Sequence, residues 1–298
     1  MERSIIELGG KTKVISLPIT WVRANGLTKG SRVSVEQNGN CLMLCTSAPG
    51  KKKAKIQVKK GELFLRRYLT MLYIMGYDEI EILFDGKARI ERLRERLEEL
   101  LGYALMDQGE HHVSIRNVAA PMEEESEAMQ RRAFTILTNM AKELPDAWQG
   151  NDKDALARIA ELEPLMDKLT NFCKRVINKV SSAERSHATY SFIILDHLEK
   201  MSDQFCHLAS HLKDAKVTQR PELRSIMASL GELVAQLERL YFHMDKKALP
   251  GFKEKRKQLV AAIEKEFEHC RPKEARILAY CSALAELVMD TELLLVFL

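Results

Sequence analysis

The feature that most constrains the fold of this chain is a helical pattern that occurs twice in its C-terminal half. Asn151-Asp152-Lys153-Asp154-Ala155-Leu156 matches Met244-Asp245-Lys246-Lys247-Ala248-Leu249 at an offset of 93 residues, which also pairs Phe134 with Met227, Leu137 with Leu230 and Trp148 with Tyr241. At an offset of 87, Glu199 and Asp203 correspond to Glu286 and Asp290. Because a single three-helix unit leaves an apolar face uncovered, the repeat predicts two three-helix bundles packed together, over residues 122–215 and 220–298.

Apolar residues at spacings of three and four predict six helices in this part of the chain. We place them at 131–150, 152–180, 188–213, 221–246, 252–270 and 276–298. The last helix is apolar but contains Glu286, Asp290 and Glu292, each of which costs about 2.5 kcal/mol or more near the centre of a bilayer. We therefore expect no membrane insertion, and with no apolar segment after Met1 we expect a cytoplasmic protein.

The first 47 residues have the two-residue period of strands. Turn signals at Gly9-Gly10, Thr28-Lys29-Gly30-Ser31 and Asn38-Gly39-Asn40 separate four strands, and a short helix is expected from Ile19 to Asn25, between Pro18 and Gly26. A β-element this small has too little apolar surface to stand alone, so we expect it to form a homodimer.

The segment 54–118 predicts a small α+β linker domain. Strands are expected at 55–59 and 79–84 and near 104–106 and 113–118, with helices at 61–75 and 88–101. The predicted fold class is thus multidomain α+β, with an N-terminal β-domain, this middle domain and an all-α C-terminal domain.

Charge is distributed unevenly along the chain, although the formal net charge is only +4. Residues 1–60 hold 12 Lys and Arg against 3 Asp and Glu, and the remainder holds 34 against 39. A basic arm on a mildly acidic body is typical of proteins that bind a polyanion. We expect the N-terminal domain to bind DNA through basic residues around its first loop, its helix and the strand after its turn: Arg3, Lys11, Lys13, Arg23 and Arg32.

Pairs of acidic residues four positions apart occur on three predicted helices. Glu199 and Asp203 form one pair, which His207 extends, and Glu286 and Asp290 form the equivalent pair in the second repeat. Two carboxylates on one helical face repel each other, and a divalent cation, or iron or zinc beside the histidine, would relieve this repulsion. A third pair, Glu163 and Asp167, lies next to Pro164. The alternative is that these residues merely form solvated helix faces.

The sequence contains no catalytic motif. There is no Gly-x-Ser-x-Gly turn, phosphate-binding glycine loop or His-Glu-x-x-His, and the six cysteines include no Cys-x-x-Cys pair. Cys206 and His207 are adjacent on a helix and point about 100° apart, so they do not form a catalytic pair. We therefore expect a binding protein with no catalytic residues and no organic cofactor.

The first 47 residues resemble the AbrB/SpoVT family of swapped-hairpin DNA-binding domains. The resemblance rests on Gly9-Gly10-Lys11-Thr12-Lys13-Val14-Ile15-Ser16-Leu17-Pro18, on Trp21-Val22-Arg23, and on Lys29-Gly30-Ser31-Arg32-Val33. It implies that two chains interlace into one barrel and that Lys11, Lys13, Arg23 and Arg32 meet DNA.

The region from about 127 to 298 resembles the PhoU family of phosphate-uptake regulators, through Leu198-Glu199-Lys200-Met201-Ser202-Asp203-Gln204 and, more weakly, through Glu286 to Asp290. That family has two three-helix bundles, each with an acidic E-x-x-x-D motif. The residues around 286–290 are more apolar than is usual in that family. The order of the two resemblances is that of the AbrB–PhoU fusion regulators typical of archaea.

Together these features predict a DNA-binding transcriptional regulator of phosphate uptake whose helical domain senses metal or phosphate status. The alternative is a PhoU-type modulator of a phosphate transporter ATPase or sensor kinase that does not bind DNA. A third reading, a metal-dependent hydrolase or metal store using Glu199, Asp203, His207 and Glu286, lacks a converging base, nucleophile and oxyanion donor.

Overall fold

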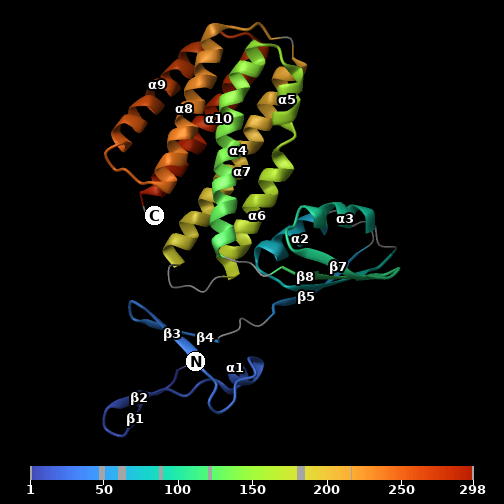
Figure 1. Ribbon diagram of the computed structural model, residues 1–298, viewed down its shortest axis with the longest axis vertical. Coiled ribbons are helices and arrows are strands. Elements are labelled where there is room, and N and C mark those ends of the chain that lie inside the picture. Colours follow the sequence, from blue (N-terminus) through green and yellow to red (C-terminus); the bar gives the residue numbers. More distant parts are fainter. Residues whose placement is uncertain are drawn as a thin grey trace. The chain divides into compact units, whose positions relative to one another are not determined.

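The structure is a computed structural model that describes residues 2–46, 51–59, 65–86, 90–119, 123–179, 185–215 and 217–296. The chain is mixed α+β, with small sheets and a helical C-terminal region (Figure 1). It divides into two compact units, Met1–Lys52 and Lys53–Leu298. We describe each unit separately.

The first unit consists of two hairpins and a short helix. Its elements are β1 (Ile6–Leu8), β2 (Thr12–Val14), α1 (Ile19–Ala24), β3 (Val33–Asn38) and β4 (Cys41–Thr46). The hairpins β1-β2 and β3-β4 are separate two-stranded antiparallel sheets. Gly39 has a φ of +58° in the two-residue turn that lets Asn38 pair with Cys41, a conformation that glycine adopts without strain.

The described residues of this first unit form no hydrophobic core of their own. Among residues 2–46, none whose burial is described is buried. Large apolar side chains are instead exposed on both hairpins and around the helix, at Ile5, Ile6, Leu8, Ile15, Ile19, Val35 and Leu42.

The second unit begins with a four-stranded sheet and two helices, which we call the sheet domain. The elements are β5 (Lys53–Val58), α2 (Leu65–Ile74), β6 (Glu79–Phe84), α3 (Ile90–Glu98), β7 (Tyr103–Gln108) and β8 (His112–Asn117). The strand order is β5-β6-β8-β7, in which β5 and β6 are parallel and the other neighbours antiparallel. Helices α2 and α3 cover the same face of this sheet (Figure 1).

Alternation along the strands explains why only one face of the sheet is covered. Ile80 and Ile82 of β6 are buried, as are Val113 and Ile115 of β8. The residues between them point to the opposite face, where ion pairs join neighbouring strands, as in Lys53–Glu79 (2.7 Å) and Lys55–Glu81 (3.1 Å). The sheet therefore has one apolar and one charged side.

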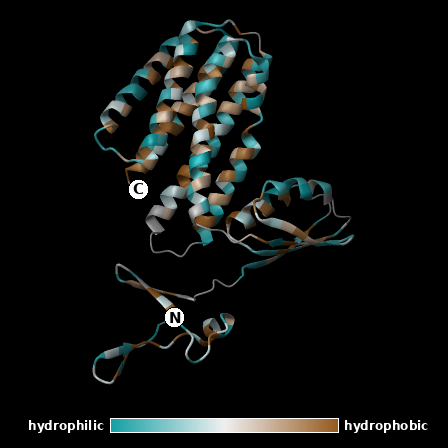
Figure 2. Cartoon of the chain, viewed as in Figure 1, coloured by the Kyte–Doolittle hydropathy of each residue, from teal (hydrophilic) through white to brown (hydrophobic). Residues whose placement is uncertain are grey.

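The rest of the second unit is helical. Its helices are α4 (Glu123–Gln149), α5 (Lys153–Ala160), α6 (Glu163–Lys179), α7 (Arg185–Asp214), α8 (Pro221–Phe242), α9 (Leu249–Phe267) and α10 (Pro272–Leu295). They share one hydrophobic core that extends from Ala133 to Leu295. In Figure 2 brown and teal segments alternate along these helices, as expected for helices with one buried and one exposed face.

The matched segments of the repeat form similar turns. Asp152 caps α5 by accepting a hydrogen bond from the backbone N–H of Ala155 (2.8 Å). Asp245 accepts one from the N–H of Lys247 (2.9 Å), just before α9 begins. No helix among the described residues is both long and apolar enough to cross a bilayer.

One helix prediction was wrong. The sequence predicted a single helix over 152–180, whereas the structure has α5 and α6 separated at Glu161 and Leu162. Pro164 explains the break, because proline has no N–H and is compatible with the first turn of a helix but not with its interior. The helical region thus has seven helices among its described residues, where six were predicted.

Helix α6 is buried over much of its length. Every residue from Leu169 to Val176 is buried, including Lys174 and Arg175. The helix packs on α4 and α7, and on α2 of the sheet domain. It therefore lies between the sheet domain and helices α4 and α7.

Arg175 joins α6 to the sheet domain. Its guanidinium donates to the carbonyl oxygens of Tyr73 (2.7 Å) and Tyr77 (2.8 Å) and to Oδ1 of Asp78 (2.9 Å). It also lies over the rings of Tyr73 and Tyr103, with its carbon 4.9 and 5.3 Å from the ring centres. This buried cation fixes the C-terminal end of α2 against α6.

Candidate functional site

Two acidic pairs lie on neighbouring helices. Glu163 and Asp167 are four residues apart on α6, and Glu199 and Asp203 are four apart on α7, so each pair projects from one side of its helix. Helices α6 and α7 pack against each other. We call these four residues the acidic cluster.

The negative charges of each pair act on the aspartate of the other pair. Burial, together with the negative charges of Glu199 and Asp203, raises the pKa of Asp167 to about 6. Burial also raises the pKa of Asp203 to about 6, with added contributions from Glu163 and Glu199. Each aspartate thus loses solvation and meets negative charge from the other helix.

Lys174 of α6 supplies a buried positive charge beside the cluster. Its Nζ lies 2.7 Å from Oε2 of Glu199 and 3.2 Å from Oδ1 of Asp196, and its side chain is 4% exposed. The hydroxyl of Thr170 donates a further hydrogen bond to the same Glu199 oxygen (3.3 Å). Glu199 is therefore held in an ion pair, whereas the pKa values of Asp167 and Asp203 are raised.

A second cation approaches from the sheet domain. Arg96 of α3 is buried, and its pKa is lowered by this burial and by the charge of Arg66. Asp167 and Glu199 oppose that shift, so their charges reach across to α3. Nε of Arg96 donates to the hydroxyl of Thr70 (2.9 Å). The acidic cluster is thus coupled electrostatically to the sheet domain.

The second acidic pair of the repeat lies elsewhere on the helices. Glu286 and Asp290 are exposed on α10. Asp290 interacts with His197 of α7, whose pKa is lowered by burial despite this carboxylate, and Nδ1 of His197 lies 3.1 Å from the hydroxyl of Thr291. At the offset of 93 residues, Arg256 and Val260 of α9 occupy the places of Glu163 and Asp167. The second repeat therefore lacks the facing carboxylates.

His207 lies one turn beyond Asp203 and is exposed. Its charge lowers the pKa of Asp203 and so opposes part of the effect of burial. Its ring is 6.3 Å from that of Tyr280 on α10, at the edge of a hollow of about 250 Å³ that His211 also lines.

The chemistry available to the acidic cluster is that of a cation site. Carboxylate oxygens are the ligands that Mg²⁺ and Ca²⁺ prefer, and a cation would offset both the repulsion and the raised pKa values of the two aspartates. In the described part of the chain, no three His, Cys, Asp or Glu side chains are already arranged around a common metal position. Binding a metal here requires the side chains to turn toward one another.

The five basic residues expected to bind DNA are all exposed in the first unit. Lys11 lies in the turn between β1 and β2, and Arg23 lies in the last turn of α1. Lys13 forms an ion pair with Glu7, its cross-strand neighbour. Such an exposed pair is weak, and the ammonium can exchange it for a phosphate.

Three residues beside the acidic cluster were not predicted from the sequence: Lys174, Arg96 and Asp196. Lys174 carried one signal, since it lies with Arg175 in the otherwise mostly apolar run from Phe172 to Val176. Arg96 carried none, because its role depends on packing between segments about 70 residues apart. Comparisons of the chain with known protein families, with curated proteins and with solved structures found no match.

Proposed function

We propose that this chain is a homodimeric, cytoplasmic DNA-binding regulator of phosphate uptake and not an enzyme. Its first unit would bind DNA, and its PhoU-like helical region would sense metal or phosphate status. The observation that carries the proposal is the first unit, which is basic, carries exposed apolar side chains and, within its described residues, forms no core of its own.

A second copy of the same unit is the partner that we propose for these apolar side chains. Burying a large aliphatic side chain stabilises a protein by about 1.5–3 kcal/mol, and one small hairpin pair offers nowhere to bury seven of them. An interlaced barrel of two chains, as in the AbrB/SpoVT family, would supply that interior. It would also present the basic loops twice, as a two-fold DNA site requires.

The proposed dimer is tested by introducing a charged side chain on the exposed apolar face of the β3-β4 hairpin. Leu42 is 68% exposed and points to the same side of the β3-β4 hairpin as Val35. We expect Leu42→Glu to make the full chain monomeric in sedimentation and to abolish DNA binding. Ser34→Glu, on the opposite face of the hairpin, is the control. Equal effects of the two variants would refute the proposed interface.

DNA binding is tested through its salt dependence, with the full chain and a duplex of random sequence. Each phosphate neutralised contributes about −0.9 to the slope of log K against log salt. We expect Lys11→Ala with Arg23→Ala to weaken binding and flatten this slope. Lys253→Ala with Lys257→Ala on α9, which removes the same charge from exposed sites, should change neither. A flat slope for the unaltered chain would contradict DNA binding.

For the sensing part, we propose that the acidic cluster binds a divalent cation. A bound cation would compete with Lys174 for Glu199, and its charge would act on Arg96, whose pKa the carboxylates of Asp167 and Glu199 raise. Because Arg96 belongs to α3, binding would change the charge felt by the sheet domain, which follows the DNA-binding unit in the chain. Manganese and magnesium should raise the melting temperature of the unaltered chain but not that of Asp167→Asn. Asp154→Asn, at an exposed position on α5, is the control.

A second candidate function has one observation in its favour. Tyr68, Met71 and Met75 are about half exposed and lie at helical spacing along α2 and just beyond it. Such an apolar stripe suits a protein partner, as expected for a modulator of a transporter ATPase or a sensor kinase. Specific capture of such a partner that Met71→Glu abolishes, together with no DNA binding by the unaltered chain, would favour this reading.

A further inference from the structure

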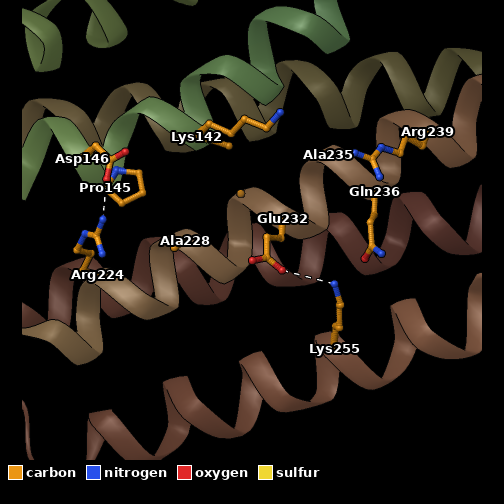
Figure 3. A pocket seen from close by; sticks show the side chains of 12 residues that line it. Lys142, Pro145, Asp146, Arg224, Ala228, Glu232, Ala235, Gln236, Arg239 and Lys255 are labelled. Atoms are coloured by element: carbon orange, nitrogen blue, oxygen red, sulfur yellow. Dashed lines mark hydrogen bonds and ion pairs between the residues drawn. The ribbon is translucent and has the colours of Figure 1, made fainter.

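A groove runs over α8 between α4 and α9, so both repeats contribute to it, and it is distinct from the acidic cluster. Its volume is about 560 Å³, within the range of pockets that hold small organic ligands. Four basic and two acidic side chains line it (Figure 3). These are Lys142, Arg224, Arg239 and Lys255, with Asp146 and Glu232.

Small residues explain why the groove is hollow. Ala228, Gly231 and Ala235 follow one another along the side of α8 that forms its floor. Gly231 is required there, because a Cβ at this position would lie 2.9 Å from the carbonyl oxygen of Ala141 on α4. Pro145 in α4 has no N–H to donate to that carbonyl. The two helices thus approach closely and leave an apolar floor.

The charges in the groove are only partly paired. Arg224 binds Asp146 at one end (2.8 Å), and Lys255 lies 3.5 Å from Glu232. Lys142 and Arg239 have no carboxylate partner within the described ranges. In Figure 3 both extend from their helices along the same part of the groove, opposite the Glu232–Lys255 pair. An excess of positive charge therefore gathers away from the Arg224 end.

Gln236 adds a polar group in the same part of the groove. Its Oε1 is one of two buried side-chain oxygens without a hydrogen-bond partner in the described structure. A buried acceptor of this kind costs about 1–3 kcal/mol unless a donor reaches it. Figure 3 shows the Gln236 amide directed toward Lys255. A ligand with both anionic oxygens and a hydroxyl or amino donor would satisfy the cations and this amide together.

We propose that this groove binds a phosphorylated small molecule of about nucleotide size. The phosphates contact Lys142, Arg239 and Lys255. Lys255 leaves its ion pair with Glu232 to make this contact. The organic part lies on the apolar floor of Ala228, Gly231 and Ala235 and brings a donor to Gln236. A free inorganic anion would use the cations alone and leave both the floor and most of the volume unfilled.

Calorimetric titration of the full chain without divalent cations tests the proposal, with ATP, tripolyphosphate and sulfate as probes. We expect saturable binding of ATP, weaker binding of tripolyphosphate because it lacks an organic part, and weaker binding still of sulfate. If ATP and tripolyphosphate bind equally, the floor contributes nothing and the proposal fails. It fails also if ATP does not bind at millimolar concentration.

Two pairs of variants locate the site. Lys142→Ala with Arg239→Ala should weaken ATP binding at least about tenfold, since a hydrogen bond to a charged group contributes about 1.5–3 kcal/mol. Lys253→Ala with Lys257→Ala removes the same charge outside the groove and should have little effect. Ala228→Leu fills the floor and should abolish binding, whereas Ser229→Leu, the next residue on α8, should not. Equal losses in test and control variants would overturn the proposal.

This inference is independent of DNA binding. The groove lies wholly in the second unit, and none of its residues belongs to the basic loops or to the acidic cluster. ATP binding can therefore be present in a chain that fails to bind DNA, and each proposal can be refuted alone.

Discussion

Replacing Arg175 by methionine should destabilise the second unit strongly. Arg175 is 1% exposed, and its guanidinium makes three hydrogen bonds to the sheet domain. Methionine keeps much of the side-chain volume but removes the charge and all three bonds. The question is how much of that loss the remaining partners offset.

The magnitude follows from what each acceptor retains. The carbonyl oxygen of Tyr73 keeps the N–H of Gly76 (3.0 Å), that of Tyr77 keeps the hydroxyl of Tyr103 (2.7 Å), and Asp78 keeps its ion pair with Lys179. No acceptor is left without a donor. Removing one member of a buried ion pair typically costs about 3–5 kcal/mol. We therefore expect Arg175→Met to cost about 3 kcal/mol, at the lower end of that range.

Urea unfolding followed by circular dichroism measures this loss, with Arg158→Met as the control. Arg158 pairs with Glu143 across an exposed 3.4 Å contact, so its loss should cost less than about 1 kcal/mol. A cycle with Asp78→Asn separates the ion pair from packing, since coupled residues give less than additive losses. If Arg175→Met costs no more than Arg158→Met, or if its effect adds fully to that of Asp78→Asn, Arg175 does not act as we describe.

Three further predictions concern the helical region. Asp167 and Asp203 bind protons more tightly when folded, with pKa values near 6 against an unfolded 3.8, so stability without divalent cations should fall as pH rises from about 4 to 7. Asp167→Asn should flatten this fall and make the chain more stable than the unaltered protein at pH 8. Guanidinium unfolding at several pH values measures this. An unchanged dependence of stability on pH would argue against the cluster. Gly231→Ala should destabilise by about 1–3 kcal/mol through its contact with the Ala141 carbonyl, whereas Gly251→Ala, which meets open space on α9, should be neutral or slightly stabilising; equal melting temperatures would contradict this.

Much of the secondary structure could be predicted from local patterns. The strand Glu79–Phe84 was expected at its observed bounds, and the turn at Gly39 follows from the residues that form it. The break at Glu161 was missed because periodicity continues across it, while Pro164 decides the backbone. The spacing of apolar side chains indicates which face of a helix is buried. It does not reveal a break that is caused by a single missing backbone hydrogen bond.

The candidate site was predictable only in part. The spacing of Glu199 and Asp203 correctly places both on one helical face. The equivalent residues of the second repeat, Glu286 and Asp290, are not part of the acidic cluster. The facing residues come from α6, and which helices face each other is decided by packing between distant segments. Lys174 stands out only through its place in a mostly apolar run, because every residue of α6 from Leu169 to Val176 is buried and the helix has no polar face there.

This enclosure of α6 has a mechanical consequence. A helix surrounded by packed neighbours cannot bend toward solvent, so it moves as a rod if it moves at all. Asp167 and Arg175 are eight residues apart, which is about 12 Å along the helix axis at about 1.5 Å per residue. An axial displacement of α6 at Asp167 therefore moves the guanidinium of Arg175, which contacts the sheet domain, by almost the same distance.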